Sequence, residues 1–155
     1  MKRGSLTGVD GQGRRMPCQL LAGTAGRAGH EVKANEGDGR AQGGGWVGAE
    51  IRYGGKVYSP LLRPIGATAL ASLEQMEALR YAHFLAPGGL AVVSKLRLLP
   101  PTAPSGMGTY PDDIVQRLHK SFKKLHYLHA APQAEPVRHP KTDKLVLLRP
   151  PPPPP

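Results

Sequence analysis

The sequence predicts an α/β fold, a Rossmann-like three-layer domain with a mostly parallel central sheet. A short apolar segment at 68–72, a helical pattern at 73–85 and an apolar run at 90–93 follow one another along the chain. Strand, helix and strand in that order form a βαβ unit. The run at 90–93 is apolar on both faces, which is typical of a parallel strand covered by helices.

Residues 47–59 are predicted to form a tight antiparallel hairpin inside this sheet. Apolar and polar residues alternate over 47–53, which is the period of a half-buried strand. Gly54-Gly55 can adopt the positive φ angles of a two-residue turn. Residues 56–59 would return along the first strand as far as Pro60, which cannot donate a ladder hydrogen bond.

The other expected elements have weaker signals. Residues 1–7 are polar and are not expected to form a buried strand, whereas 17–28 can form a helix and 30–34 a short strand. A helix beginning with Ser72 and Gln75 at capping-box spacing is expected to run to about Leu85. A last helix is expected from Pro111 to about Leu128. Its apolar stripe consists of Ile114, Leu118, Phe122 and Leu125.

The chain is expected to form one domain at 1–131, followed by a proline-rich unstructured tail at 132–155. Its 155 residues suffice for one modest core. The tail contains an unbroken run of prolines from Pro150 to Pro155 and has no apolar periodicity. A polyproline segment can bind an aromatic-lined groove, which leaves open a basic interaction module as an alternative.

Composition argues against several classes of function. The formal net charge is +10, but the basic residues are scattered, and no aromatic stacking pattern accompanies Lys120–Lys124. Nucleic-acid binding is therefore not expected as the main role. Cys18 is the one cysteine of the chain, so the chain cannot hold an iron–sulfur cluster or a zinc site by cysteine alone. We expect a cytoplasmic protein, because a single cysteine fits a reducing compartment. We also expect it to be soluble, because no apolar run has the length of a membrane span.

Three short motifs have a simple structural interpretation beside a functional one. The glycine-rich turn at 8–13 could bind phosphate, but Asp10 stands at the third position of a dinucleotide fingerprint, where glycine is required, and a plain strand-to-helix turn is favoured. His126 and His129 would lie one turn apart on the last helix without a third ligand, so no metal site is expected. Adjacent Asp112 and Asp113 match helix-start charges better than an acid/base pair.

Several segments together resemble a known family. They are GVDGQG at 8–13, VKANEGDGRAQGGG at 32–45, RYGGKVYSPL at 52–61, LEQMEALRYAHFLAPGGLAVVS at 73–94 and GMGTYPDDIVQRL at 106–118. In this order they are similar to the gamma domain of pyruvate/ketoisovalerate oxidoreductases, and most of all to the beta subunit of indolepyruvate oxidoreductase. The resemblance covers about residues 8–130.

The resemblance implies the small subunit of a 2-oxoacid:ferredoxin oxidoreductase. Its large partner subunit would carry thiamine diphosphate and iron–sulfur clusters, and the complex would convert an arylpyruvate to an acyl-CoA while reducing ferredoxin. This chain would bind no cofactor alone and supply no catalytic residue or metal ligand. It would dock near the coenzyme A side of the partner. The resemblance implies these site-lining residues: Gly11, Gln12, Gly13, Glu36, Gln42, Gly44 and Gly45.

The chain also departs from the family pattern. Asp10 stands where the family has glycine, Asp38 where it usually has histidine, Gly43 where it has arginine, and Trp46 where it has a small residue. The family's last strand and helix units have no counterpart, so we expect an altered and shortened copy. An inactive relic therefore stays open as an alternative, as does a nucleotide-binding Rossmann module, although Asp10 argues against the latter.

Overall fold

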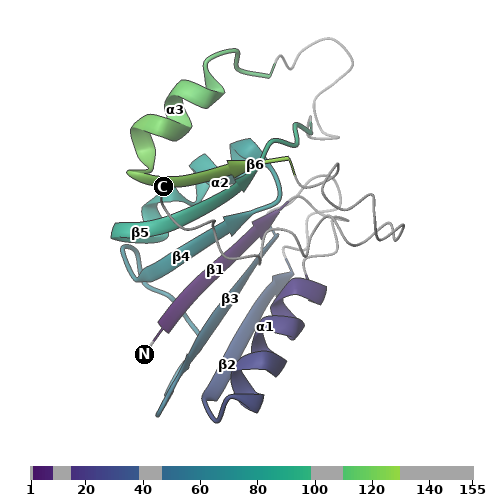
Figure 1. Ribbon diagram of the computed structural model, residues 1–155, viewed down its shortest axis with the longest axis vertical. Helices are drawn as coiled ribbons and strands as arrows, with labels where there is room; N and C mark the ends of the chain where they lie inside the picture. The colour runs from purple at the N-terminus through teal and green to yellow at the C-terminus, as the bar shows by residue number, and fades with distance from the viewer. Residues whose placement is uncertain (1, 9–14, 39–46, 99–109, 130–155) are drawn as a thin grey trace, which may run out of the picture.

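The computed structural model describes residues 2–8, 15–38, 47–98 and 110–129, which form a six-stranded sheet with helices on both faces (Figure 1). The strand order is β2-β3-β1-β4-β5-β6. The elements are β1 (Lys2–Gly8), α1 (Arg15–Arg27), β2 (Glu31–Asp38), β3 (Val47–Gly54), β4 (Ala67–Ser72), α2 (Gln75–Arg80), the 3₁₀ helix η1 (Ala82–Phe84), β5 (Leu85–Ser94), α3 (Ile114–Ser121) and β6 (Lys124–Leu128).

The predicted α/β class with a mostly parallel sheet is confirmed. Strands β1, β4, β5 and β6 pair in parallel, and β3 alone runs against its neighbours β1 and β2. Consecutive residues of β4 point to opposite faces: Leu70 packs with α2 and α3, whereas Ala71 packs with the α1 side. The sheet is therefore the middle of three layers.

The main core lies between the sheet and the α2–α3 pair. Leu70 of β4 and Leu118 of α3 are fully buried there. A smaller cluster joins Cys18 of α1 to Ala49 and Ile51 of β3. Figure 1 shows α1 beside β2 and α3 beyond β6, so the two clusters lie toward opposite ends of the sheet.

The expectation that residues 1–7 form no buried strand is wrong. Residues 2–8 form β1, an interior strand that pairs antiparallel with β3 and parallel with β4, so that Leu6 lies between Ala49 and Ala71. The local composition is polar, but pairing on both sides satisfies the backbone groups of this segment. Tertiary pairing here overrides weak strand propensity.

The predicted hairpin at 47–59 is correct only in its first strand. Residues 47–54 form β3, and an antiparallel hairpin is present, but β2 and β3 form it. Residues 56–59 are not in a strand. We call residues 55–66 the strap. The backbone of the strap bonds to side chains of the sheet, as when Glu50 Oε2 accepts from the Leu62 amide at 3.1 Å, so no ladder partner is required.

The predicted helices are shorter in the structure. Helix α2 ends at Arg80, and η1 fills part of the remaining expected range. Helix α3 ends at Ser121, and 124–128 is strand β6 instead. His126 therefore lies on a strand, and the expected pair with His129 on one helix is wrong.

The predicted strands at 30–34, 68–72 and 90–93 are confirmed within β2, β4 and β5, and the helix at 17–28 corresponds to α1. Strand β5 begins earlier than expected, at Leu85, because Leu85 pairs with Ala67 of β4. The register of the two strands then shifts between Ala67 and Ala69. Gly88, with φ +75, allows the backbone of this irregular stretch. The predicted tail at 132–155 lies outside the described residues, as does the domain boundary before it. Within the described ranges, no helix has both the length and the apolar character of a membrane span.

Candidate functional site at the carboxyl edge of the sheet

The sheet has a topological switch point between β1 and β4. After β1 the chain passes through α1 to β2, which lies toward one edge of the strand order. After β4 it passes through α2 to β5, which lies toward the opposite edge. Thr7 and Ser72 are register partners beside this point. In open α/β sheets, ligands bind in the crevice outside the carboxyl ends of the strands at such a point.

Both glycine-rich segments attach to this same edge. Gly8, Val47 and Asp38 are register partners across β1, β3 and β2, so they form one row at the end of three strands. The segment 9–14 leaves from Gly8, and the segment 39–46 joins the other two. The anchors of the two segments are thus adjacent, although the segments are far apart in sequence.

Of the predicted site residues, only Glu36 is among the described residues. It lies on β2 opposite Ala49 of β3 and is half-buried. The six others remain predictions, since they fall in the segments outside the described ranges. These are Gly11, Gln12, Gly13, Gln42, Gly44 and Gly45.

Helix α1 begins beside this edge and presents its positive end there. Its first turn contains no acidic residue, so the partial positive charge of the N-terminus is not offset by its own side chains. Cys18 in the second turn is buried, and burial, followed by the nearby Glu36 carboxylate, raises the pKa of its thiol. A protonated, enclosed thiol is a core residue and not a nucleophile.

The other side of the switch point is a buried polar turn built around Glu74. This residue is 1% exposed and caps α2, since its Oε2 accepts from the Glu77 amide at 3.0 Å. Its Oε1 accepts a short hydrogen bond from the Tyr110 hydroxyl. The Ser72 hydroxyl donates to the Glu74 carbonyl at 2.6 Å. The cap is therefore Glu74, and the expected capping box of Ser72 with Gln75 is wrong.

Gln75 links this turn to the end of β5. Its side-chain Nε2 donates to the Lys95 carbonyl at 2.7 Å, and its backbone amide donates to the Leu96 carbonyl at 3.4 Å. Arg97 lies over the Tyr110 ring at 5.3 Å. Burial and the bond to Glu74 raise the pKa of Tyr110, so its hydroxyl stays protonated and keeps donating. The arrangement holds the ends of β4 and β5 together and offers no catalytic pair.

Sequence reasoning missed the hydrogen bond between Glu74 and Tyr110. The two residues are 36 positions apart, and no periodic pattern connects them. Local sequence gave no signal for the cap either, because glutamate is not among the residues preferred at an N-cap. Within the described ranges, no group of three metal-ligating side chains occurs.

Glu77 provides a pH-dependent prediction. Burial raises the pKa of its carboxyl, the nearby Glu74 raises it further, and Arg80 at 2.8 Å opposes both. A raised folded pKa favours folding below the ordinary value of about 4.3, and this contribution is lost as pH rises through the folded pKa. Glu77→Gln should therefore gain stability relative to the wild type as pH rises from about 4 to 7.

Urea unfolding at several pH values measures this effect. The stability of Arg80→Gln should fall more steeply with rising pH than that of the wild type, because the Arg80 charge that lowers the pKa of Glu77 is removed. Identical pH slopes for the wild type and Glu77→Gln would show that this carboxyl has the same pKa in both states.

The sequence matches the family described as Pyruvate ferredoxin/flavodoxin oxidoreductase over residues 5–147. It is 36% identical over 132 residues to the indolepyruvate oxidoreductase subunit IorB of Archaeoglobus fulgidus, covering 84% of this chain and 65% of that protein. The IorB subunit of Thermococcus kodakarensis is 41% identical over 120 residues, which cover 76% of this chain and 59% of that protein. The chain thus spans less than two thirds of the length of these relatives.

Two solved structures share the fold. Pyruvate oxidoreductase subunit PORC of Thermotoga maritima superposes with a TM-score of 0.63 at 18% identity, covering 94% of this chain and 72% of that one. The 2-oxoglutarate:ferredoxin oxidoreductase of Magnetococcus marinus also superposes with a TM-score of 0.63, at 16% identity, covering 95% of this chain and 23% of that one. With the family match extending over most of its length, this chain belongs to the pyruvate ferredoxin/flavodoxin oxidoreductase family.

Proposed function

We propose that this chain is the small subunit of an indolepyruvate-type 2-oxoacid:ferredoxin oxidoreductase. The observation that carries the proposal is the row of Gly8, Val47 and Asp38, which brings the attachment points of both glycine-rich segments to one edge of the sheet, beside the switch point. The similarity to IorB subunits at 36% and 41% identity supports the same function. The complex would oxidise an arylpyruvate to an acyl-CoA with ferredoxin as acceptor.

The redox and decarboxylation chemistry would belong to the large subunit. This chain does not fit an iron–sulfur cluster, because its single Cys18 is buried in the α1 cluster. In the complex, the partner would hold thiamine diphosphate and the clusters, and the thiamine would supply the carbanion stabilisation that decarboxylation requires. A cytoplasmic location is part of the same proposal.

The contribution of this chain would be binding and enclosure. The start of α1 presents backbone amides without a competing acid in its first turn, which favours an anionic group at the switch point. The Glu74–Tyr110 bond holds the β4–α2 turn and the segment before α3 at the same edge. These features orient a ligand that the partner acts on.

Reconstitution with the thiamine diphosphate subunit from the same organism tests the proposal. The isolated chain should show no oxidation of indolepyruvate, and its addition to the large subunit should increase coenzyme A-dependent reduction of methyl viologen. The variant Asp10→Gly/Gly43→Arg should stimulate more strongly. It removes a negative charge from an anion-favouring turn and adds a cation whose charge-assisted hydrogen bond is worth about 1.5–3 kcal/mol, or about ten-fold or more in rate.

Each single variant, Asp10→Gly and Gly43→Arg, serves as a control for the double variant. Turnover by the isolated chain would contradict the subunit assignment. If neither the wild type nor the double variant binds a large subunit, the relic interpretation, which Asp10 and Gly43 favour, replaces it.

A further inference from the structure

The strap is attached to the sheet face opposite α1. Glu50 and Arg52 alternate along β3 with Ala49 and Ile51, which face α1, so these two charged side chains point to the strap side. Arg52 Nη1 donates to the carbonyl oxygens of Ser59 at 2.9 Å and Leu61 at 3.2 Å. The strap is therefore held by side chains of the sheet at several points along its length.

Neighbouring β2 adds two more attachments of the same kind. Glu31 Oε2 accepts from the Val57 amide at 3.0 Å, and Lys33 Nζ donates to the Tyr58 carbonyl at 3.3 Å. Two residues of the strap itself, Val57 and Leu62, have buried side chains. The strap is consequently a fixed layer over the sheet, with a defined inner and outer side.

The outer side of the strap is unusually apolar. Six large hydrophobic side chains are exposed among the described residues, and three of them lie on the strap. Tyr58 is 80% exposed, Leu61 60% and Ile65 61%. Ile65 borders a pocket that His83 and Phe122 also line. Tyr58 and Leu61 are therefore the exposed apolar side chains of the strap that can contribute to one interaction surface.

The strap is also rigid where it is exposed. Pro60 and Pro64 restrict their own φ angles. Ile65 has φ 60, a conformation that a β-branched residue rarely adopts, and its amide donates to the His83 carbonyl at 2.9 Å. Strained residues held by their surroundings are typical of functional surfaces. A surface fixed before binding loses little conformational entropy on association.

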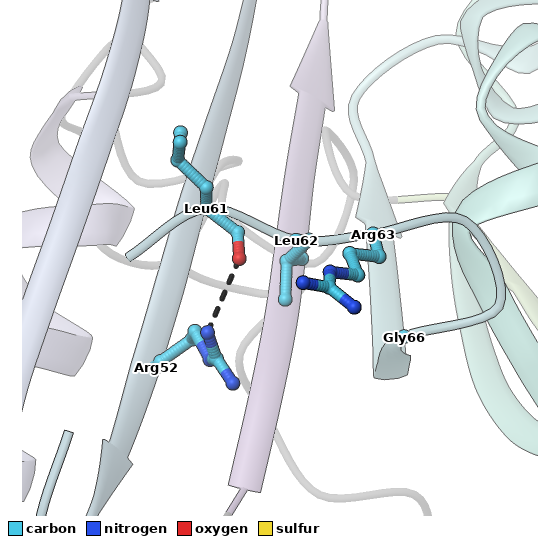
Figure 2. Close-up of a pocket in the computed structure, with 5 residues that line it drawn as sticks. All are labelled: Arg52, Leu61, Leu62, Arg63 and Gly66. Atoms are coloured by element: carbon cyan, nitrogen blue, oxygen red, sulfur yellow. Dashed lines mark hydrogen bonds between the residues drawn. The ribbon is translucent and has the colours of Figure 1, made fainter. Parts of the chain in front are cut away.

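A pocket of about 280 Å³ opens within this surface (Figure 2). It is lined by Arg52, Leu61, Leu62, Arg63 and Gly66. Figure 2 shows the Arg63 side chain extending toward Arg52 over Leu62, so that both guanidinium groups border one pocket. The carboxylate of Glu50 lies nearby, but its Oε2 accepts from the amide of the lining residue Leu62 and is thereby occupied. Arg52 already donates to strap carbonyls, so a carboxylate in the pocket would gain its charge-assisted hydrogen bonds from Arg63 and a longer-range attraction from Arg52.

Charge and size identify the kind of occupant. The strap contains Lys56 and Arg63 and no acidic residue, and Lys56 lies over the Tyr58 ring at 5.2 Å. The pocket lies at the lower limit of the volumes typical of cofactor sites, so an acidic side chain fits it better than a cofactor. Leu61, which lines the pocket and is largely exposed, favours a protein surface over a free anion.

We propose that the strap is the surface by which this chain docks on its large subunit, which presents a carboxylate flanked by apolar side chains. The inference rests on the proposed function. Gly66 precedes the first residue of β4, whereas the glycine-rich segments attach beyond the carboxyl ends of the parallel strands. Docking through the strap therefore leaves the switch point accessible to a ligand.

The test measures the affinity of the purified large subunit for strap variants by calorimetry. Arg63→Glu and Tyr58→Ala/Leu61→Ala should each weaken binding by about ten-fold or more, as expected for anchors in a docking pocket. Lys124→Glu, on the far edge strand β6, makes the same charge change and should leave the affinity unchanged. Leu20→Ala on α1 is the matched apolar control. Melting curves verify that each variant is folded.

Added salt should weaken binding by the wild type more than binding by Arg63→Glu, because the charge pair is screened. Wild-type affinity in all strap variants would overturn the docking surface and leave the proposed function intact. The docking surface would also be overturned if Arg63→Glu abolished phosphate binding at the pocket but bound the large subunit with wild-type affinity. No binding of the wild type to the large subunit would overturn the proposed function itself, and the docking surface with it.

Discussion

Replacing Glu74 by alanine is expected to destabilise the fold by about 2–4 kcal/mol. Loss of an N-cap costs about 1 kcal/mol. The change also leaves the part-buried Tyr110 hydroxyl without its acceptor, which costs about 1–3 kcal/mol more. Equilibrium unfolding in urea measures the difference, and the melting temperature should fall with it.

A double-mutant cycle with Tyr110→Phe separates the two contributions. The cost of Glu74→Ala should be smaller in the Tyr110→Phe background, because the orphaned hydroxyl is then absent. Asp113→Ala, which removes an exposed carboxylate bonded to Arg117 at 2.8 Å, is the control and should have a much smaller effect. Additive effects of the two substitutions would show that the Glu74–Tyr110 bond contributes nothing to stability.

Leu118→Ala should destabilise the domain by about 2–5 kcal/mol. Leu118 is 0% exposed and lies in the main core between α3 and the sheet. Truncation removes apolar burial and leaves a cavity that rigid strands β4 and β5 cannot fill. Small domains have total stabilities of about 5–15 kcal/mol, so this single change takes a large share.

The matched control is Leu20→Ala on α1, because Leu20 is 45% exposed. Its effect should remain within about 0.5 kcal/mol, as for most surface substitutions. Thermal unfolding followed by circular dichroism compares the two variants. Equal destabilisation by both would mean that α3 does not pack on the sheet as the structure shows.

The sequence by itself determined the class of the fold and several of its elements. Strands at 47–53, 68–72 and 90–93 follow from local apolar patterns, since burial on one or both faces of a sheet requires them. The order of strand, helix and strand around 68–93 then indicates a parallel pairing. Glycine-rich composition favours a loop from residue 35 onward, but residues 35–38 belong to β2, because their backbone pairs with β3.

Elements that depend on distant partners could not be predicted in this way. Gly54-Gly55 has the composition of a hairpin turn, yet the chain continues into the strap, because side chains of β2 and β3 bond its backbone groups. Lys124–Leu128 continues a helical apolar spacing, but pairing with β5 makes it an edge strand. In both cases, hydrogen bonds to residues far along the chain outweigh local preference.

The candidate site divides in the same manner. Resemblance to a family singled out Glu36 and the two glycine-rich segments from the sequence alone. Only the register of β1, β3 and β2 shows that Gly8, Val47 and Asp38 share one row, and only packing brings Tyr110 to Glu74. Periodicity reports which residues are buried, whereas strand register and long-range hydrogen bonds decide which of them meet.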